Sequence, residues 1–242
     1  MNDHELAAAL ASKAGQLLLK VRDELADATE CERKAAGDNR SHDFLMAALA
    51  AERPGDAVLS EEGIDDPVRL SAGRVWIVDP LDGTREFSEP GRDDWAVHVA
   101  FWQSGELVAG AIALPAQGIT LATPHVALAP AAHRAPRIVV SRTRPPAIAA
   151  RVRERLGGTL DQMGSAGAKV ASIVQGFSDV YVHAGGQYEW DSAAPVAVAR
   201  AAGLHASRID GSALQYNQAD PLLPDLLICR PELADAVLTV TG

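Results

Sequence analysis

The residues in this chain best suited to chemistry are carboxylates that stand at the ends of predicted elements. Asp79 and Asp82 follow residues 75–78, an apolar run that reads as a buried strand. The other acids at element ends are Asp38, Glu61, Glu62 and Asp191. Magnesium prefers hard oxygen donors of this kind and bridges to substrate phosphate, so together they predict a site for two or three Mg²⁺ ions.

The turn after residues 75–78 could hold an anion beside these acids. Pro80 lacks an N–H and should take the chain out of the strand. Gly83 can adopt a positive φ, which would let the N–H groups of Gly83 and Thr84 point at a phosphate. A divalent cation held by Asp79 and Asp82 would then bridge to a phosphate oxygen.

Each of these features also has a purely structural interpretation. Asp-Pro and Asp-Gly are common turn signals. Asp38 could begin a helix, Glu61 and Glu62 could be a solvated loop pair, and Asp191 could cap a helix. Only their combination favours a metal site.

Composition and motifs exclude several other classes of function. A formal net charge of -10 argues against binding a nucleic-acid polymer or an anionic membrane. The chain has no P-loop and no G-x-S-x-G elbow, and its histidines stand singly, which indicates core or surface roles. Two distant cysteines, Cys31 and Cys229, and a polar, acidic amino terminus favour the cytoplasm. Residues 107–132 carry no charge, but prolines and glycines divide them into pieces too short to span a membrane, so we expect no integral membrane segment.

The hydrophobic pattern predicts two joined halves, residues 1–133 with the metal site and an antiparallel sheet, and residues 134–242 with strand–helix units that complete the substrate pocket. We expect one compact unit. Residues 31–40 read as a polar loop, with a second helix starting near Ser41. The other predicted helices are 2–25, 146–156, 168–176 and 191–202, and the predicted strands are 58–59, 75–78, 95–102, 108–114, 137–141 and 179–183.

Three motifs, in order, resemble the signature of the inositol monophosphatase superfamily: Glu61-Glu62, the run Asp79-Pro80-Leu81-Asp82-Gly83-Thr84, and Trp190-Asp191-Ser192-Ala193-Ala194. The resemblance implies a layered α-β-α-β-α sandwich of α+β/α/β class (the sugar phosphatase fold) and a lithium-sensitive, Mg²⁺-dependent phosphatase, with a homodimer plausible. Residues 59–62 and 82–87 look most like the CysQ-type members, which remove the 3′-phosphate of 3′-phosphoadenosine 5′-phosphate in sulfate assimilation.

The resemblance also implies a role for each residue. Metal ligands would be Glu61, Asp79, the Leu81 carbonyl, Asp82 and Asp191, and these ligands, apart from Asp79, would also contact the substrate. Gly83 and Thr84 would cradle the phosphate. Asp38 and the Thr84 hydroxyl, helped by Glu62, would orient or deprotonate the attacking water.

The second half would select the substrate, a small phosphate monoester. Residues that could line an adenosine and 5′-phosphate pocket are Arg85, Ser141, Arg142, Arg144, Ser165 and Lys169, although each cation could equally be a surface charge. Residues 34–37 depart from the family pattern, and an upstream flap that often contributes to a third metal site is missing or shortened. Inositol monophosphatase or fructose-1,6-bisphosphatase activity, or a non-catalytic metal-binding regulatory role, remain the alternatives.

Overall fold

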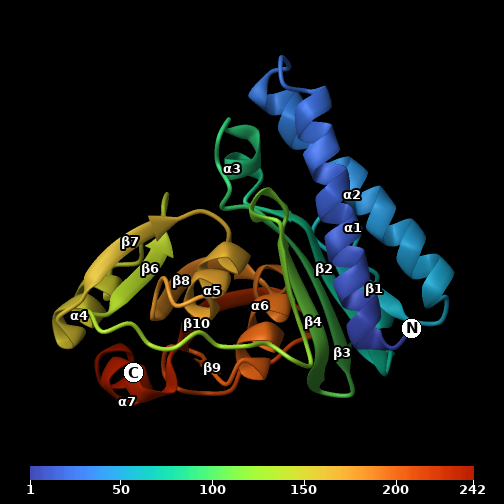
Figure 1. The fold of residues 1–242 in the computed structure, drawn as a ribbon. Coiled ribbons are helices and arrows are strands. Elements are labelled where there is room, and N and C mark those ends of the chain that lie inside the picture. The colour runs from blue at the N-terminus through green and yellow to red at the C-terminus, as the bar shows by residue number, and fades with distance from the viewer.

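The computed structural model describes residues 1–242 and contains two five-stranded sheets (Figure 1). The first sheet has the order β1-β2-β3-β4-β5. β1 runs parallel to β2, and every other neighbouring pair is antiparallel. The strands of the first sheet are β1 (Ala57–Ser60), β2 (Arg74–Asp82), β3 (Ala96–Gln103), β4 (Glu106–Leu114) and β5 (Ile119–Ala122).

The second sheet is mixed and has the order β7-β6-β8-β10-β9. β6 lies parallel to both β7 and β8, whereas β10 runs antiparallel to β8 and β9. The strands of the second sheet are β6 (Arg137–Ser141), β7 (Thr159–Met163), β8 (Val180–Tyr188), β9 (His205–Ser207) and β10 (Leu222–Cys229).

Helices cover both sheets and also separate them, which gives five layers (Figure 1). The outer layer on the first sheet is α1 (Asp3–Glu24) and α2 (Glu30–Glu52), and the central layer is α5 (Ala166–Val174) and α6 (Glu189–Ala201). The far outer layer is α4 (Ile148–Leu156) and α7 (Ala234–Thr241). Between these layers lie three apolar clusters. The expected α-β-α-β-α sandwich is confirmed.

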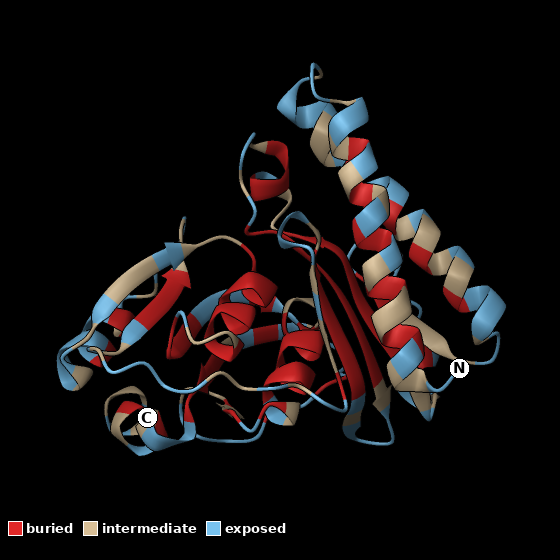
Figure 2. Cartoon of the chain, viewed as in Figure 1, coloured by how far each residue is buried: buried red, intermediate tan, exposed pale blue.

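The central helices are buried almost all round, as Figure 2 shows. Alanines such as Ala193, Ala194 and Ala199 are fully buried, and their small side chains let α6 pack against strands of the first sheet on one side and β8 and β10 on the other. The short connecting elements are α3 (Thr84–Ser88), η1 (Pro67–Ser71), η2 (Pro115–Gln117) and η3 (Pro231–Leu233).

The prediction of a loop over residues 31–40 is wrong, because these residues belong to α2. A capping box between Thr29 and Glu32 starts the helix at Glu30, and several of the polar residues that suggested a loop, such as Asn39 and Arg40, are exposed on the helix surface. Gly37 stands inside the helix because a Cβ there would come within 2.7 Å of both Leu81 and Phe87. Asp38 is therefore a residue of the helix interior rather than the residue before a helix.

Pro80 does interrupt the pairing of β2 with β3, but the interruption is a short β-bulge, after which the pairing resumes. β2 pairs with β3 at Asp79, loses the register, and pairs again at Asp82. The predicted strands and helices otherwise exist, with shifted ends, and β5 is the second of the buried strands expected within residues 107–132. The elements that were not predicted are α3, β7, β9, β10 and α7. Residues 107–132 include β4 and β5, and none of the helices has both the length and the hydropathy of a bilayer span. The division at residue 133 stays a prediction.

Candidate metal and phosphate site

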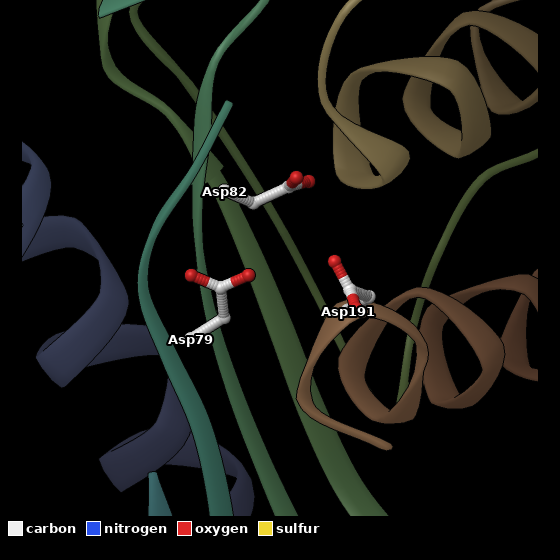
Figure 3. Close-up of side chains that lie close together, drawn as sticks. All are labelled: Asp79, Asp82 and Asp191. Atoms are coloured by element: carbon white, nitrogen blue, oxygen red, sulfur yellow. The ribbon is translucent and has the colours of Figure 1, made fainter. Parts of the chain in front are cut away.

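Three aspartates from different parts of the chain converge where β2 ends and α6 begins. Figure 3 shows Asp79 and Asp82 directed from the β2 segment, and Asp191 directed from the first turn of α6, into one space. One carboxylate oxygen of each lies within 4.8 Å of the others. The bulge at Pro80 is what lets both β2 aspartates contribute, because residues three apart in a regular strand point to opposite faces.

Backbone and side-chain donors hold one oxygen of each aspartate. Asp79 Oδ1 accepts a hydrogen bond from the Leu81 N–H (3.0 Å). Asp191 Oδ2 accepts one from the Tyr188 N–H (2.7 Å), as an acid in the first turn of a helix does. The other oxygen of Asp191 accepts no hydrogen bond within the chain and remains available to a ligand.

Asp82 is the most firmly held of the three. Its Oδ2 accepts hydrogen bonds from the Gly167 N–H at the start of α5 (2.8 Å) and from the Ser165 hydroxyl. The Nε2 of buried His98 lies 3.1 Å from the same oxygen. Its Oδ1 is left without a partner in the chain, so it can face an ion.

The electrostatics fit a cation at this point. Burial, followed by the charges of Glu61, Asp82 and Asp191, raises the pKa of Asp79 well above its usual value. Burial and then the charge of Asp82 raise the pKa of Asp191 to about 6. The pKa of Asp82 is lowered because His98 and other donors outweigh its burial. Converging carboxylates that resist ionisation together, with free oxygens, can hold a hard divalent cation.

Glu61 and Glu62 occupy the turn after β1, and both residues are exposed. The carboxyl of Glu61 nevertheless lies against that of Asp79, and loss of hydration with the charges of Asp191 and Asp82 raises the pKa of Glu61 to about 7. Glu62 lies near Asp38, whose pKa is raised to about 6 by burial and then by the charge of Glu62. The predicted acids thus surround one site.

The hydroxyl of Thr84 connects Asp38 to the turn. Thr84 Oγ1 lies 3.2 Å from Asp38 Oδ1 and 3.0 Å from the Leu81 carbonyl oxygen, and its proton can be donated to either acceptor. The Thr84 side chain therefore contacts both the Leu81 carbonyl, which is predicted to bind a metal ion, and Asp38, its predicted partner in catalysis. Gly83 precedes Thr84 with φ of 85°, and a Cβ at Gly83 would lie 3.2 Å from Ser165, so the backbone here approaches α5 closely.

A cavity of about 290 Å³ opens beside the three aspartates. It is lined mainly by polar residues, which come from the Asp82–Glu86 segment, the loop after β6, the start of α5, and β8. The lining residues that the sequence predicted are Asp82, Gly83, Thr84, Arg85, Ser141, Arg142, Arg144, Ser165, Lys169 and Asp191. Glu61 and Leu81 do not line it.

The cations of the cavity differ in what they already contact. Arg142 is held by Glu89 through two bonds of 2.9 Å and by Glu86 at 2.8 Å. Lys169 is buried and donates to the Gly164 and Ser165 carbonyls, and burial lowers its pKa to about 8. Arg144 has no carboxylate within ion-pair distance, and its guanidinium lies against Gly186. Arg144 is therefore the cation most open to an anionic ligand.

Several site residues were missed from the sequence. His98 was expected to have a core or surface role, and it is buried, but it also contacts Asp82. Its position three residues after Trp95 in a predicted strand gave no sign of this contact. The lining residues without a predicted role are Glu86, Tyr181, His183, Gly186 and Gln187. Of those on β8, Tyr181 and His183 lie within the predicted strand, whereas Gly186 and Gln187 lie beyond its predicted end at residue 183.

Comparison with known proteins decides the family. A sequence model described as "Inositol monophosphatase family" matches residues 2–240. The chain belongs to the inositol monophosphatase family. Relatives within this group include "3'-phosphoadenosine 5'-phosphate phosphatase" of Mycobacterium bovis, 53% identical over 93% of this chain and 88% of the relative. The Mycobacterium leprae protein of the same name is 51% identical over 99% of this chain and 93% of the relative.

A solved structure of the inositol monophosphatase family agrees with the fold. It is described as CysQ from Bacteroides thetaiotaomicron, "a bacterial member of the inositol monophosphatase family". It superposes with a TM-score of 0.76 at 28% identity, covering 93% of this chain and 96% of that chain. The similarity therefore extends over both sheets and all five layers.

Proposed function

We propose that this protein is a Mg²⁺-dependent phosphomonoesterase that removes the 3′-phosphate of 3′-phosphoadenosine 5′-phosphate, giving AMP and phosphate. The observation that carries the proposal is a polar cavity lined both by two acids of the cluster, Asp82 and Asp191, and by Arg144, which has no carboxylate partner. A substrate with two separate phosphates suits such a cavity. The relatives that are about half identical carry the name of this activity.

The ions that suit the donor set are two or three Mg²⁺, because every side-chain ligand offered is a hard carboxylate oxygen. Their proposed ligands are Glu61, Asp79, the Leu81 carbonyl, Asp82 and Asp191. When bound, Mg²⁺ lowers the pKa of water and offsets the negative charge of the phosphate.

The chain's own residues then orient the reaction. Thr84 Oγ1 donates its proton to Asp38 Oδ1 and can accept one from the attacking water, so the pair aligns a water lone pair with the phosphorus. Glu62 raises the proton affinity of Asp38. Backbone N–H groups of Gly83 and Thr84 face the transferred phosphate. Water attacks in line and passes one proton through Thr84 to Asp38, the P–O3′ bond breaks, and the 3′-oxygen takes a proton from solvent. Asp38 then returns its proton to solvent.

The second half of the chain would select the nucleotide. Arg144 and Lys169 supply positive charge for the 5′-phosphate, and Ser141 and Ser165 line the same cavity. Arg142 lines the cavity, and its contact with the substrate stays a prediction. Because Glu86 and Glu89 already hold the guanidinium of Arg142, Arg142 links the loop after β6 to α3, and residues of both segments line the cavity.

The test is phosphate release in the presence of Mg²⁺, comparing 3′-phosphoadenosine 5′-phosphate with inositol 1-phosphate and fructose 1,6-bisphosphate. A kcat/KM higher by about 100-fold for the nucleotide, or about 2.7 kcal/mol of transition-state binding, supports the proposal. Similar values for all three indicate a broad sugar and nucleotide phosphatase. No release from any of them, with Mg²⁺ bound, indicates a metal-binding regulatory protein.

A further inference from the structure

A buried polar bridge connects three segments that are far apart in the sequence. We call it the Arg69 bridge, and its members are Asp65, Arg69, Asn217 and Glu189. Only 1% of Arg69 and of Glu189 is exposed, and only 7% of Asn217, whereas Asp65 is exposed and forms the surface end of the bridge. Buried ionic and amide groups of this kind are stable only when every polar atom has a partner. None of the bridge residues lines the cavity or belongs to the acidic cluster.

The contacts of the bridge are mutual. Arg69 donates from Nε and Nη2 to the two oxygens of Asp65 (2.6 and 2.9 Å) and from Nη1 to Asn217 Oδ1 (2.9 Å). Asn217 Nδ2 donates back to the Arg69 carbonyl (3.0 Å). Glu189 accepts from the backbone N–H groups of Asn217 (2.6 Å) and Gln218 (2.7 Å). The chain from residue 65 to residue 69 is thereby fixed to the start of α6.

The two ends of the bridge lie next to two proposed metal ligands on separate segments. Asp65 is four residues after Glu61, in the connection between β1 and η1. Glu189 is the first residue of α6, two residues before Asp191. Glu61 lies in the turn that follows β1, which we call the Glu61 turn. The start of this turn is already fixed, because β1 pairs with β2 up to Ser60 and Val78. The bridge therefore closes the second end of this turn onto the element that carries Asp191.

We propose that the Arg69 bridge is a positioning device that holds the Glu61 turn and the start of α6 at a fixed separation, and thereby sets the affinity of the site for Mg²⁺. The proposal rests on the metal ligands proposed above. Without a cation, the carboxylates of Glu61 and Asp191 repel each other. The bridge resists this repulsion, so a cation enters a site that is already formed and less ordering accompanies binding.

Two variants test the proposal without changing any metal ligand. Asn217→Gly removes both side-chain contacts with Arg69. Glycine tolerates the positive φ of 60° at this position, and it keeps the backbone N–H that donates a hydrogen bond to Glu189. Arg69→Met keeps similar volume but removes all of the guanidinium contacts. The matched control is Arg230→Met, because Arg230 is also buried (4% exposed) and bonded to an aspartate, Asp179, yet lies away from the acids.

The measurement is Mg²⁺ binding to the substrate-free protein, by calorimetry and by the rise of the unfolding temperature with Mg²⁺ concentration. We expect Asn217→Gly and Arg69→Met to weaken binding on the order of tenfold, as loss of contacts outside the ligands typically does. Arg230→Met should lower the unfolding temperature but leave binding within about twofold of the native value.

Two results would overturn the proposal. One is native Mg²⁺ affinity in both bridge variants, and the other is an equal loss in Arg230→Met, which would indicate general destabilisation. Failure of the native protein itself to bind Mg²⁺ would overturn the proposed ligands and the bridge proposal together. Because binding is measured without substrate, a failure of the nucleotidase assignment alone would leave these results unaffected.

Discussion

Thr84 Oγ1 lies 3.2 Å from Asp38 Oδ1, which joins the first residue of α3 to the interior of α2. Thr84 is 46 residues from Asp38 in sequence. Gly37 brings α2 close enough for this contact, because any larger side chain there would collide with Leu81 and Phe87. The catalytic pair we propose therefore depends on the packing of α2 against the turn that ends β2.

Replacing Asp38 should reduce turnover with little effect on substrate binding. Asp38→Asn keeps the size of the side chain and an oxygen that can accept from Thr84, but it removes the basic carboxylate, so kcat should fall by about 10²- to 10⁴-fold with KM nearly unchanged. Steady-state phosphate release is the measurement. The matched control is Asp43→Asn, an exposed residue of the same helix. Equal activity in Asp38→Asn and Asp43→Asn would exclude the role proposed for Asp38.

Removing one acid of the cluster should have opposite effects with and without metal. Asp79→Asn removes a buried negative charge, together with its cost of desolvation and its repulsion by the neighbouring acids. The metal-free variant should therefore unfold at a higher temperature than the native protein. Its stabilisation by Mg²⁺ should be largely lost, because a ligand is gone. Thermal unfolding with and without Mg²⁺ measures both effects. Lower stability of the metal-free variant would show that Asp79 has a structural role instead.

Sequence patterns were sufficient for the acids and for most of the elements. Asp79 and Asp82 stand after a hydrophobic run and Asp191 stands at the start of a predicted helix, and the ends of elements are where side chains from distant segments can meet. The resemblance to a known family then predicted the five layers correctly. The loop prediction for residues 31–40 failed because composition suggested solvent exposure, whereas a capping box and one buried glycine, Gly37, decide the structure there.

Contacts between distant segments could not be predicted in the same way. His98 looked like an ordinary strand residue, and only the register of β2 with β3 places it beside Asp79 and Asp82. Arg142 was predicted to contact the substrate, and in the fold its guanidinium also forms ion pairs with Glu86 of α3 and with Glu89, the residue after α3. Which cation is free for a ligand depends on tertiary ion pairs, and these have no local signal in the sequence.

The stability of the metal-free protein should fall as pH rises from about 4.5 to about 7. Glu61, with a pKa raised to about 7, binds its proton more tightly when folded than when unfolded. Its stabilising contribution is therefore fully present below about pH 4.5 and is lost as pH rises through 7. Asp191, with a pKa near 6, acts in the same direction at slightly lower pH. Unfolding temperatures from pH 5 to pH 8 measure the trend.

A variant separates this trend from other titrations. Burial lowers the pKa of His183 to about 4, so His183 makes the fold more stable as pH rises through 6.5 and opposes the effect of Glu61. Glu61→Gln leaves His183 in place, and its unfolding temperature should fall less between pH 6 and pH 8 than that of the native protein. Parallel pH profiles for the two proteins would contradict the assignment to Glu61.

Arg144 should determine how strongly the second phosphate of the substrate is bound. Its guanidinium has no carboxylate partner, so Arg144→Ala should cost one charge-assisted interaction, about 1.5–3 kcal/mol, and raise KM for 3′-phosphoadenosine 5′-phosphate by about 10- to 100-fold. For 3′-AMP, which lacks the 5′-phosphate, the same variant should behave like the native protein. Arg151→Ala, on the exposed face of α4, is the control for loss of a positive charge. If Arg144→Ala leaves both KM values unchanged, Arg144 does not bind the 5′-phosphate, and the buried Lys169 becomes the next cation of the cavity to test.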